Sequence, residues 1–182
     1  MKSHRLMHSA VVLMLLSATA FAQSDAQKPV AQSDAQKSFD KMKTLAGSWE
    51  GQVKTVPPEP SIEGKLTQVS FRVTSMGNTL VHEMTMGGRP DDPITMVYLD
   101  GDRLLLTHYC DAGNRPRMVA KTSPDGKRVE FDFLDVAGGT EYGHMHHAVF
   151  TVIDANHHTE DWTYMMPGDK PVHAHVDLQR TK

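Results

Sequence analysis

The sequence predicts an all-β protein: a short N-terminal helix followed by an antiparallel up-and-down β-barrel of about ten strands. From Ser48 onward, apolar residues recur at every second position, which is the period of a β-strand. Turn-forming pairs such as Asp100-Gly101 separate these segments at roughly 8–15-residue spacing. No segment after the first helix has a helical period, so the strands are expected to follow one another as hairpins.

The composition narrows the class of protein further. A chain of 182 residues fits about one domain, and 39% apolar with 23% charged residues is ordinary for a globular protein. A net charge of −3 argues against a nucleic-acid partner. One cysteine excludes an intrachain disulfide and a multi-thiolate metal site. Since no run of 18 apolar residues occurs, no membrane-spanning helix is expected.

The first 22 residues have the three parts of a signal peptide. Lys2 and Arg5 give a basic start, and the short apolar run Ala10–Leu16 follows. Ala20-Phe21-Ala22 then places small residues at the two positions that a signal peptidase reads. We therefore expect cleavage after Ala22 and a periplasmic or secreted protein.

A polar repeat follows the expected cleavage site. AQSDAQK occurs at Ala22–Lys28 and again at Ala31–Lys37. Because it lacks apolar periodicity, residues 23–37 are expected to form a flexible tether, with the barrel domain at 38–182.

The expected helix begins at Ser38, whose side chain is a typical N-cap. Phe39, Met42 and Leu45 recur every three positions, and Gly47 ends the helix after about two turns.

Period-two segments bounded by turn residues then give the strands. They are expected at Ser48–Val56, Lys65–Met76, Thr79–Met86, Ile94–Leu99, Arg103–Cys110, Pro116–Ser123, Lys127–Val136, His147–Ile153, Thr159–Met166 and Val172–Leu178. An open sheet of ten strands would expose two edges, which favours closure into a barrel. A two-sheet sandwich is the main alternative, because it has the same alternation.

The junction between the helix and the first strand resembles the lipocalins and related calycin-like barrels. The residues are Leu45-Ala46-Gly47-Ser48-Trp49-Glu50-Gly51, which contain their Gly-x-Trp motif. The resemblance implies structural roles for Gly47 and Trp49, with the indole closing one end of the barrel.

A closer resemblance is to exported bacterial proteins of unknown function that have lipocalin-like barrels, and it extends over Phe39–Arg180. The segments that carry it are Tyr98–Leu104, Leu106–Cys110, Asn114–Met118, His144–Phe150 and Thr159–Thr163. It implies a fold and export, and it supplies no activity.

The haem-binding nitrobindin-like barrels are more distantly similar. They share Gly47, Trp49 and Gly51, but their motif continues to a Tyr-Pro-Thr segment. Here the chain continues as Gln52–Pro57 without that segment, which argues against haem. We assign no cofactor from the sequence.

Two histidine pairs are the candidate metal ligands. His144 and His146 are two residues apart, as are His173 and His175, so each pair shares one face of a strand. The competing interpretation is that these are solvated outer-face residues, since His173 and His175 alternate with an apolar row. No metal site is assigned.

His108 and Cys110 also share a strand face. A nucleophile and base would need a directed hydrogen bond and a third orienting group, which the sequence does not indicate. We interpret His108 as a polar wall residue and Cys110 as a small buried one. No catalytic residue is assigned.

Inward-facing residues of the expected barrel are mostly apolar with a few polar tips, which is typical of a small-molecule pocket. The pocket-lining candidates are Phe71, Met84, Met96, Tyr98, Leu106, His108, Met118, Phe131, Phe133, Phe150, Trp162 and Tyr164.

Three functions remain open from the sequence. The first is a non-enzymatic protein that binds a small hydrophobic or amphipathic molecule in the barrel, and we favour it over catalysis. The second is an enzyme of unrecognised type that uses the barrel histidines. The third is a structural barrel filled by its own side chains, because filled and hollow barrels show the same alternation. The sequence does not indicate the oligomeric state.

Overall fold

The computed structural model describes residues 32–86, 93–123 and 125–181. The expected signal peptide, most of the expected tether and the first AQSDAQK copy lie outside these residues. The elements are α1 (Asp34–Lys43), β1 (Gly47–Val56), β2 (Leu66–Thr74), the 3₁₀ turn η1 (Ser75–Gly77), β3 (Thr79–Met86), β4 (Ile94–Asp100), β5 (Arg103–Tyr109), β6 (Arg115–Thr122), β7 (Arg128–Ala137), β8 (His144–Val152), β9 (His157–Met166) and β10 (Lys170–Arg180). The described helices include none that is long and apolar enough to cross a membrane.

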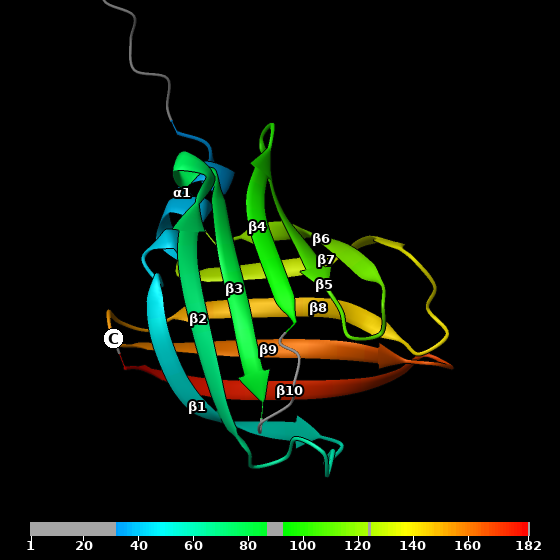
Figure 1. Ribbon diagram of the computed structural model, residues 1–182. Coiled ribbons are helices and arrows are strands. Elements are labelled where there is room, and N and C mark those ends of the chain that lie inside the picture. The colour runs from blue at the N-terminus through cyan, green and yellow to red at the C-terminus, as the bar shows by residue number, and fades with distance from the viewer. Residues whose placement is uncertain (1–31, 87–92, 124, 182) are drawn as a thin grey trace, which may run out of the picture. The chain divides into compact units, whose positions relative to one another are not determined.

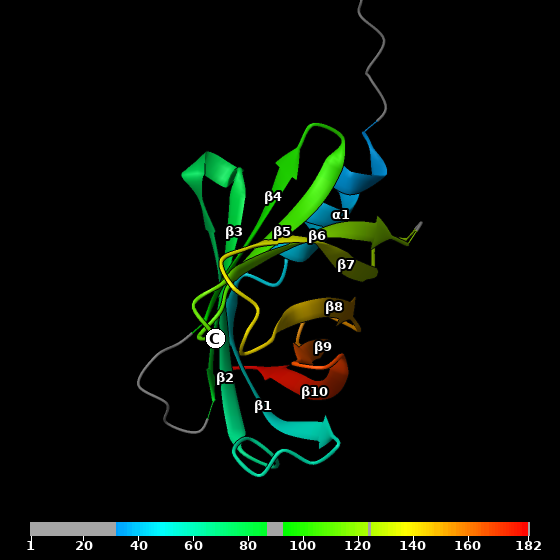
Figure 2. The same cartoon turned by 90° about the vertical axis from the view of Figure 1, so that its right-hand side faces the viewer.

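The ten strands form one closed antiparallel barrel, in which each strand pairs with its neighbours in the chain. β1 closes it by pairing with both β2 and β10: Trp49 lies opposite Val69 on one side and Arg180 on the other. Figures 1 and 2 show β2–β4 running steeply across β7–β10, so the sheet curls round on itself. The prediction of a ten-stranded up-and-down barrel is confirmed, and the sandwich is excluded.

The helix begins earlier than predicted. Ser33, not Ser38, is its N-cap, and the Ser33 hydroxyl accepts a 3.1 Å hydrogen bond from the backbone N–H of Gln36. Ser33 and Gln36 have the Ser-x-x-Gln spacing of a capping box, and the second AQSDAQK copy supplies both. Ser38 is a buried residue inside the helix. Residues 34–37 therefore belong to α1 and not to a tether.

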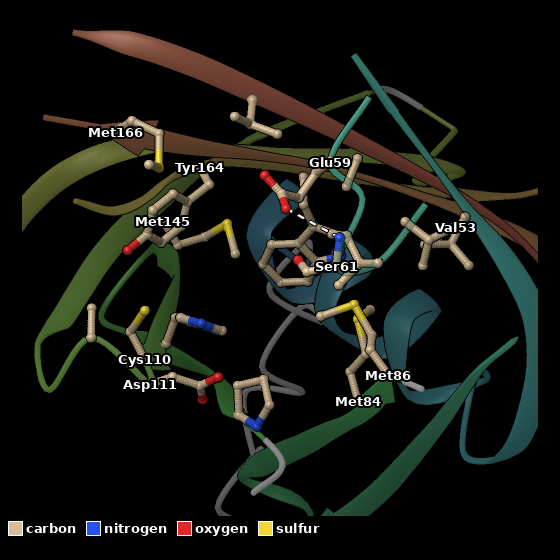
Figure 3. A pocket seen from close by; sticks show the side chains of 18 of the residues that line it. Val53, Glu59, Ser61, Met84, Met86, Cys110, Asp111, Met145, Tyr164 and Met166 are labelled. Carbon is tan, nitrogen blue, oxygen red and sulfur yellow. Dashed lines mark hydrogen bonds between the residues drawn. The ribbon is translucent and has the colours of Figure 1, made fainter. Parts of the chain in front are cut away.

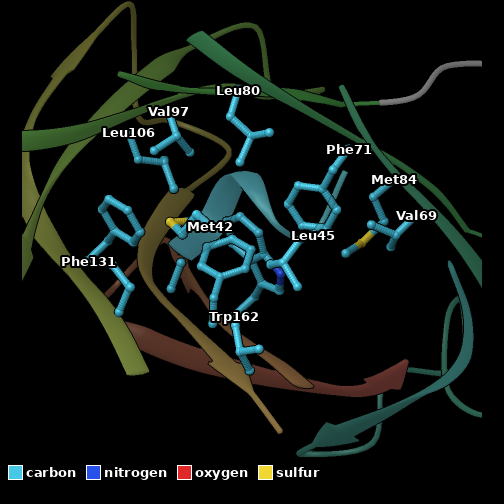
Figure 4. Close-up of a cluster of buried hydrophobic side chains, with 14 of the residues drawn as sticks. Met42, Leu45, Val69, Phe71, Leu80, Met84, Val97, Leu106, Phe131 and Trp162 are labelled. Atoms are coloured by element: carbon cyan, nitrogen blue, oxygen red, sulfur yellow. The ribbon is translucent and has the colours of Figure 1, made fainter. Parts of the chain in front are cut away.

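The apolar face of α1 packs into one end of the barrel. Phe39, Met42 and Leu45 are almost completely buried there, in a single cluster with Trp49 and inner-face residues of the strands (Figure 4). The helix therefore acts as the plug of the barrel.

Trp49 fixes the plug to the wall. Its indole Nε1 donates a 2.8 Å hydrogen bond to the backbone oxygen of Leu45, and the guanidinium of Arg180 lies 4.0 Å from the ring centroid. Arg180 also donates hydrogen bonds of 2.7 and 3.0 Å to the backbone oxygens of Ala46 and Thr44. Gly47 has φ 134°, a conformation that favours glycine, where the chain turns from helix to strand. These contacts agree with the structural roles expected for Gly47 and Trp49.

Candidate functional site

The other half of the barrel contains a cavity of about 310 Å³ (Figure 3). Core residues near α1 come from the first halves of β3 and β5, such as Leu80 and Leu104. Cavity residues come from the last halves of the same strands, such as Met84 and His108. The cavity therefore lies at the end of the barrel opposite the plug, and we call this end the open half.

The lining of the cavity is mainly apolar. Its apolar members are Val53, Ile62, Met84, Met86, Pro93, Ala112, Met145, Trp162, Met166, Val172, Ala174 and Val176. Its polar members are Glu59, Ser61, His82, His108, Cys110, Asp111 and Tyr164. The flexible, polarisable thioethers of four methionines suit a binding surface that adapts to its ligand.

A polar row crosses the floor of the cavity on three adjacent strands. His82 of β3 lies opposite Thr95 of β4, and Thr95 lies opposite His108 of β5. All three are buried and alternate with apolar inner-face neighbours such as Leu80 and Val97. Residues two apart on a strand share a face, so His82 lies on the inner face with Leu80, and Thr95 lies there with Val97.

His108 is held as a neutral imidazole. Its Nδ1 lies 2.8 Å from the hydroxyl oxygen of Thr95. Burial, together with the charge of His82, lowers the pKa of His108 from 6.5 to about 3. Its Nε2 has no hydrogen-bond partner among the described residues. This atom is not completely enclosed by them either. Because His108 lines the cavity, this nitrogen is available to a molecule inside it.

Behind the row lies a buried carboxylate network. Glu160 accepts hydrogen bonds from Nε2 of His82 at 3.1 Å, Nε2 of His158 at 3.1 Å and Nε1 of Trp162 at 2.9 Å. Burial alone would raise the pKa of Glu160, but the charges and hydrogen bonds of His82 and His158 outweigh it and hold that pKa below its usual value. An ionised carboxylate only accepts hydrogen bonds, so both histidines must donate from Nε2.

The rim of the cavity contains the thiol of Cys110 and the phenol of Tyr164. Burial raises the pKa of both groups, and the neighbouring Asp111 raises each of them further. Cys110 therefore stays a thiol, which is a poor nucleophile. Tyr164 donates a 2.8 Å hydrogen bond to the backbone oxygen of Tyr142. Because Nδ1 of His108 is engaged by Thr95, the described contacts do not form a thiol–imidazole pair.

The predicted pocket residues divide into three groups. Met84, His108, Trp162 and Tyr164 line the cavity. Phe71, Leu106, Met118, Phe131 and Phe150 belong to the packed core. Met96, Tyr98 and Phe133 lie elsewhere: the first two on the opposite face of β4 from Thr95 and Val97, and Phe133 stacked on His146.

The placement of Met96 and Tyr98 corrects the sequence expectation. The segment Ile-Thr-Met-Val-Tyr-Leu has bulky residues on both faces of the strand, and Met96 and Tyr98 were expected on the inner face. The structure instead buries Thr95 and Val97, and Tyr98 makes a 3.1 Å hydrogen bond to Thr107 on the outer face. Thr95 is the residue that the hydrogen bond to His108 requires inside the barrel.

Sequence reasoning missed His82, His158 and Glu160 as parts of one network. The two-residue spacing on β9 could have indicated this network. His158 and Glu160 precede Trp162 at two-residue intervals, so all three side chains lie on the same inner face of the strand. An acid at an inward position between apolar residues requires buried partners. Since those partners lie on different strands, only the barrel geometry shows which residues they are.

The two predicted histidine pairs do not converge on a common site. His144 and His146 lie 3.2 Å apart through their ring nitrogens and both pack on Phe133. His173 and His175 lie on the outer face, hydrogen-bonded to Thr163 and Asp161 respectively.

Metal-ligating atoms gather on the outer wall at Glu130, Asp132 and His147, the one such group of three among the described residues. Arg128 and Lys121 already pair with its two carboxylates. Because these cations neutralise the acids, we assign no metal there.

Comparison with known proteins identifies the fold alone. No family model and no curated protein matches the sequence. Among solved structures, Rv2717c from M. tuberculosis is similar with a TM-score of 0.56 and 15% identity, over 80% of this chain and 98% of that one. A protein of unknown function from the DUF3598 family of Nostoc punctiforme has the same score and identity, over 77% of this chain and 48% of that one. The chain therefore shares its overall fold with these proteins at low sequence identity.

The size of the cavity limits the size of a ligand inside it. At about 30 Å³ for each water-sized group, 310 Å³ corresponds to roughly ten such groups, and a porphyrin would have to extend beyond the cavity through its rim. The barrel end that would have to widen is bounded by the methionine and tyrosine side chains of the rim. A small organic molecule is the size of ligand that this volume admits.

Proposed function

We propose that this protein binds one small, mainly apolar molecule in the open half of its barrel. The observation that carries the proposal is the cavity of about 310 Å³, with an apolar wall and a few polar groups on its floor. This combination is typical of small-molecule sites, and the volume is at the lower end of their range. A barrel filled by its own side chains would leave no such space.

The expected affinity follows from the area that the ligand buries. A molecule of about ten non-hydrogen atoms buries roughly 200–300 Å² of apolar surface, which contributes about 5–7 kcal/mol at ~25 cal/mol/Å². The loss of translational and rotational freedom on association reduces this gain, so the dissociation constant is expected to be no tighter than about 10 µM. Tighter binding requires a specific polar contact in addition.

Naphthalene tests the proposal, because it has ten carbons, no charge and no polar group. Isothermal titration calorimetry should show saturable binding of one naphthalene per chain. Ala174→Phe fills the cavity from β10 and should weaken binding at least about tenfold, by removing most of the buried apolar contact. His173→Phe adds the same ring to the outer face one residue away and should leave binding unchanged. Absence of saturable heat with the wild type, or equal affinities of the two variants, would contradict the proposal.

We further propose that the protein is exported to the periplasm or secreted. Support comes from Met1–Ala22, with its basic start, short apolar run and Ala-x-Ala end. Intact-mass measurement of the protein made in its own cell should give a chain that begins at Gln23. A soluble cytoplasmic product that retains Met1 would contradict export.

A further inference from the structure

The tautomer of His108 follows from the hydroxyl that holds it. Thr95 is completely buried. Among the described residues, the hydroxyl of Thr95 is hydrogen-bonded to Nδ1 of His108. If Nδ1 donated to this oxygen, the hydroxyl hydrogen would be buried without an acceptor, at the cost of a lost hydrogen bond. Thr95 therefore donates to Nδ1. A neutral imidazole that accepts at Nδ1 has its proton on Nε2, the nitrogen that the described residues leave unpaired and not fully enclosed on a residue that lines the cavity.

The charge of the lining opposes an anionic ligand. No Lys or Arg occurs among the described residues that line the cavity, and the carboxylate of Glu59 lies at its edge. The buried carboxylate of Glu160 lies directly behind His82 and Trp162. A ligand carboxylate would lose its hydration without gaining a Lys or Arg partner among the described lining residues, which makes its burial costly.

The Nε2–H of His108 also opposes a ligand that only donates hydrogen bonds. An ammonium group placed against it would bring two donors together without an acceptor. A pure hydrocarbon would leave the Nε2–H without a partner inside an apolar space. A carbonyl or ether oxygen satisfies this donor and carries no charge.

From these contacts we infer that the ligand is a neutral molecule of about ten non-hydrogen atoms with one hydrogen-bond acceptor, of the ketone, aldehyde, ester or ether class, and that His108 Nε2–H binds the acceptor. This inference rests on the proposed function, because it names the ligand class of the same cavity. The apolar remainder of the ligand lies against the methionines and Trp162.

Four nine-carbon probes test the inference on the whole mature chain: 2-nonanone, nonane, nonanoate and nonylamine. They differ in the head group while the chain stays the same. By calorimetry and tryptophan emission, we expect 2-nonanone to bind about ten- to a hundredfold more tightly than nonane, the range for satisfying a buried donor. Nonanoate and nonylamine should bind more weakly than 2-nonanone.

Two variants locate the preference at the imidazole. His108→Phe keeps a ring of similar size without the donor, so 2-nonanone and nonane should bind it with affinities within about threefold of each other. Thr95→Val keeps the shape but removes the hydroxyl that fixes the tautomer, so it should reduce the ketone preference partially. Thr107→Val, on the outer face beside Tyr98, is the matched control and should preserve the preference.

Nitrogen NMR of the labelled protein reads the tautomer without any ligand. We expect His108 to show a protonated Nε2 and an unprotonated Nδ1 in the wild type, and a mixture of tautomers in Thr95→Val.

The possible outcomes separate the two proposals. Equal binding of 2-nonanone and nonane, tightest binding of nonanoate or nonylamine, or a protonated Nδ1 overturns the assignment of the ligand class, while naphthalene binding still supports the cavity's function. Failure of naphthalene and of all four probes overturns the function and the inference together. The wild-type series requires no variant, so the result does not depend on whether His108→Phe folds.

Discussion

The packed half and the open half of the barrel are built from the same ten strands but are filled differently. In the packed half, α1 adds Phe39 and Met42 to the inner-face residues, and the space is occupied by a continuous apolar cluster. No helix of the described residues enters the open half, and the side chains of the wall leave about 310 Å³ between them. Close packing and the cavity are therefore separated along the length of one barrel.

The buried polar residues lie at the boundary between the two halves. Phe71 and Phe150 of the core contact the ring of His82, and Trp162 on the cavity side contacts both His82 and His108. The Glu160 network thus joins the plug to the site. The difference between the halves predicts that equal truncations should have unequal effects.

Replacement of Trp49 at the packed end should have the largest effect. Trp49→Ala removes a buried indole, its hydrogen bond to Leu45 and the surface under Arg180, and should lower the free energy of unfolding by about 3–5 kcal/mol. Urea denaturation measures it. Tyr142→Ala, which truncates an exposed ring, should change the free energy by less than about 0.5 kcal/mol. A loss below about 1 kcal/mol for Trp49→Ala would mean that the plug does not depend on this residue.

Two methionines compare the halves directly. Met42→Ala creates a new cavity in the packed half and should cost about 2–5 kcal/mol. Met84→Ala enlarges a cavity that already exists, and should cost only about 1–2 kcal/mol because fewer packed neighbours lose contacts. Urea denaturation of both variants gives the difference, and naphthalene calorimetry should show that Met84→Ala alone changes the binding. Equal stability losses would show that the open half is as tightly packed as the closed one.

The last prediction concerns the dependence of stability on pH. The pKa of His108 falls from 6.5 to about 3 on folding, so below pH 6.5 the unfolded chain binds a proton that the native chain does not. Stability should therefore decrease as the pH falls from about 6.5 toward 4.5, by up to about 1.4 kcal/mol per pH unit from this group. Glu160 continues the decrease below its ordinary value of 4.5, because its folded pKa is also depressed.

Urea denaturation at several pH values checks this dependence. His108→Phe should flatten the profile between pH 6.5 and 4.5, whereas His173→Phe on the exposed face should keep the wild-type slope. An unchanged slope in His108→Phe would mean that its imidazole is accessible to protons in the native state.

The sequence predicted the strands well because their signals are local. Alternation and turn pairs such as Asp100-Gly101 placed β4 and β5 within one residue of their observed bounds. The start of α1 was wrong, because the polar repeat concealed the cap formed by Ser33 and Gln36. Closure of the barrel depends on the pairing of β1 with β10, two strands that are far apart in the sequence, so the local alternation of residues does not predict it.

The site was less predictable for the same reason. Met84, His108, Trp162 and Tyr164 line the cavity, but the sequence does not say how far along each strand the plug extends. Residues such as Phe131 and Met118 have the same parity as the cavity residues and lie in the core instead. The two-residue alternation shows which face of a strand a residue occupies. Whether that residue lies in the core or in the cavity depends on where α1 packs along the barrel.

The contacts of Arg180 have a consequence for the order of folding. This residue follows nearly the whole chain, yet it binds the backbone oxygens of Thr44 and Ala46, 136 and 134 residues earlier. Until β10 has been synthesised, β1 and β9 each have an unpaired edge and the indole of Trp49 lacks its cover. Contacts of such long sequence separation form slowly, since a large loop must close before they stabilise anything. A growing chain therefore stays incompletely folded until its last strand is available, and only then can the barrel seal the plug that its first helix supplies.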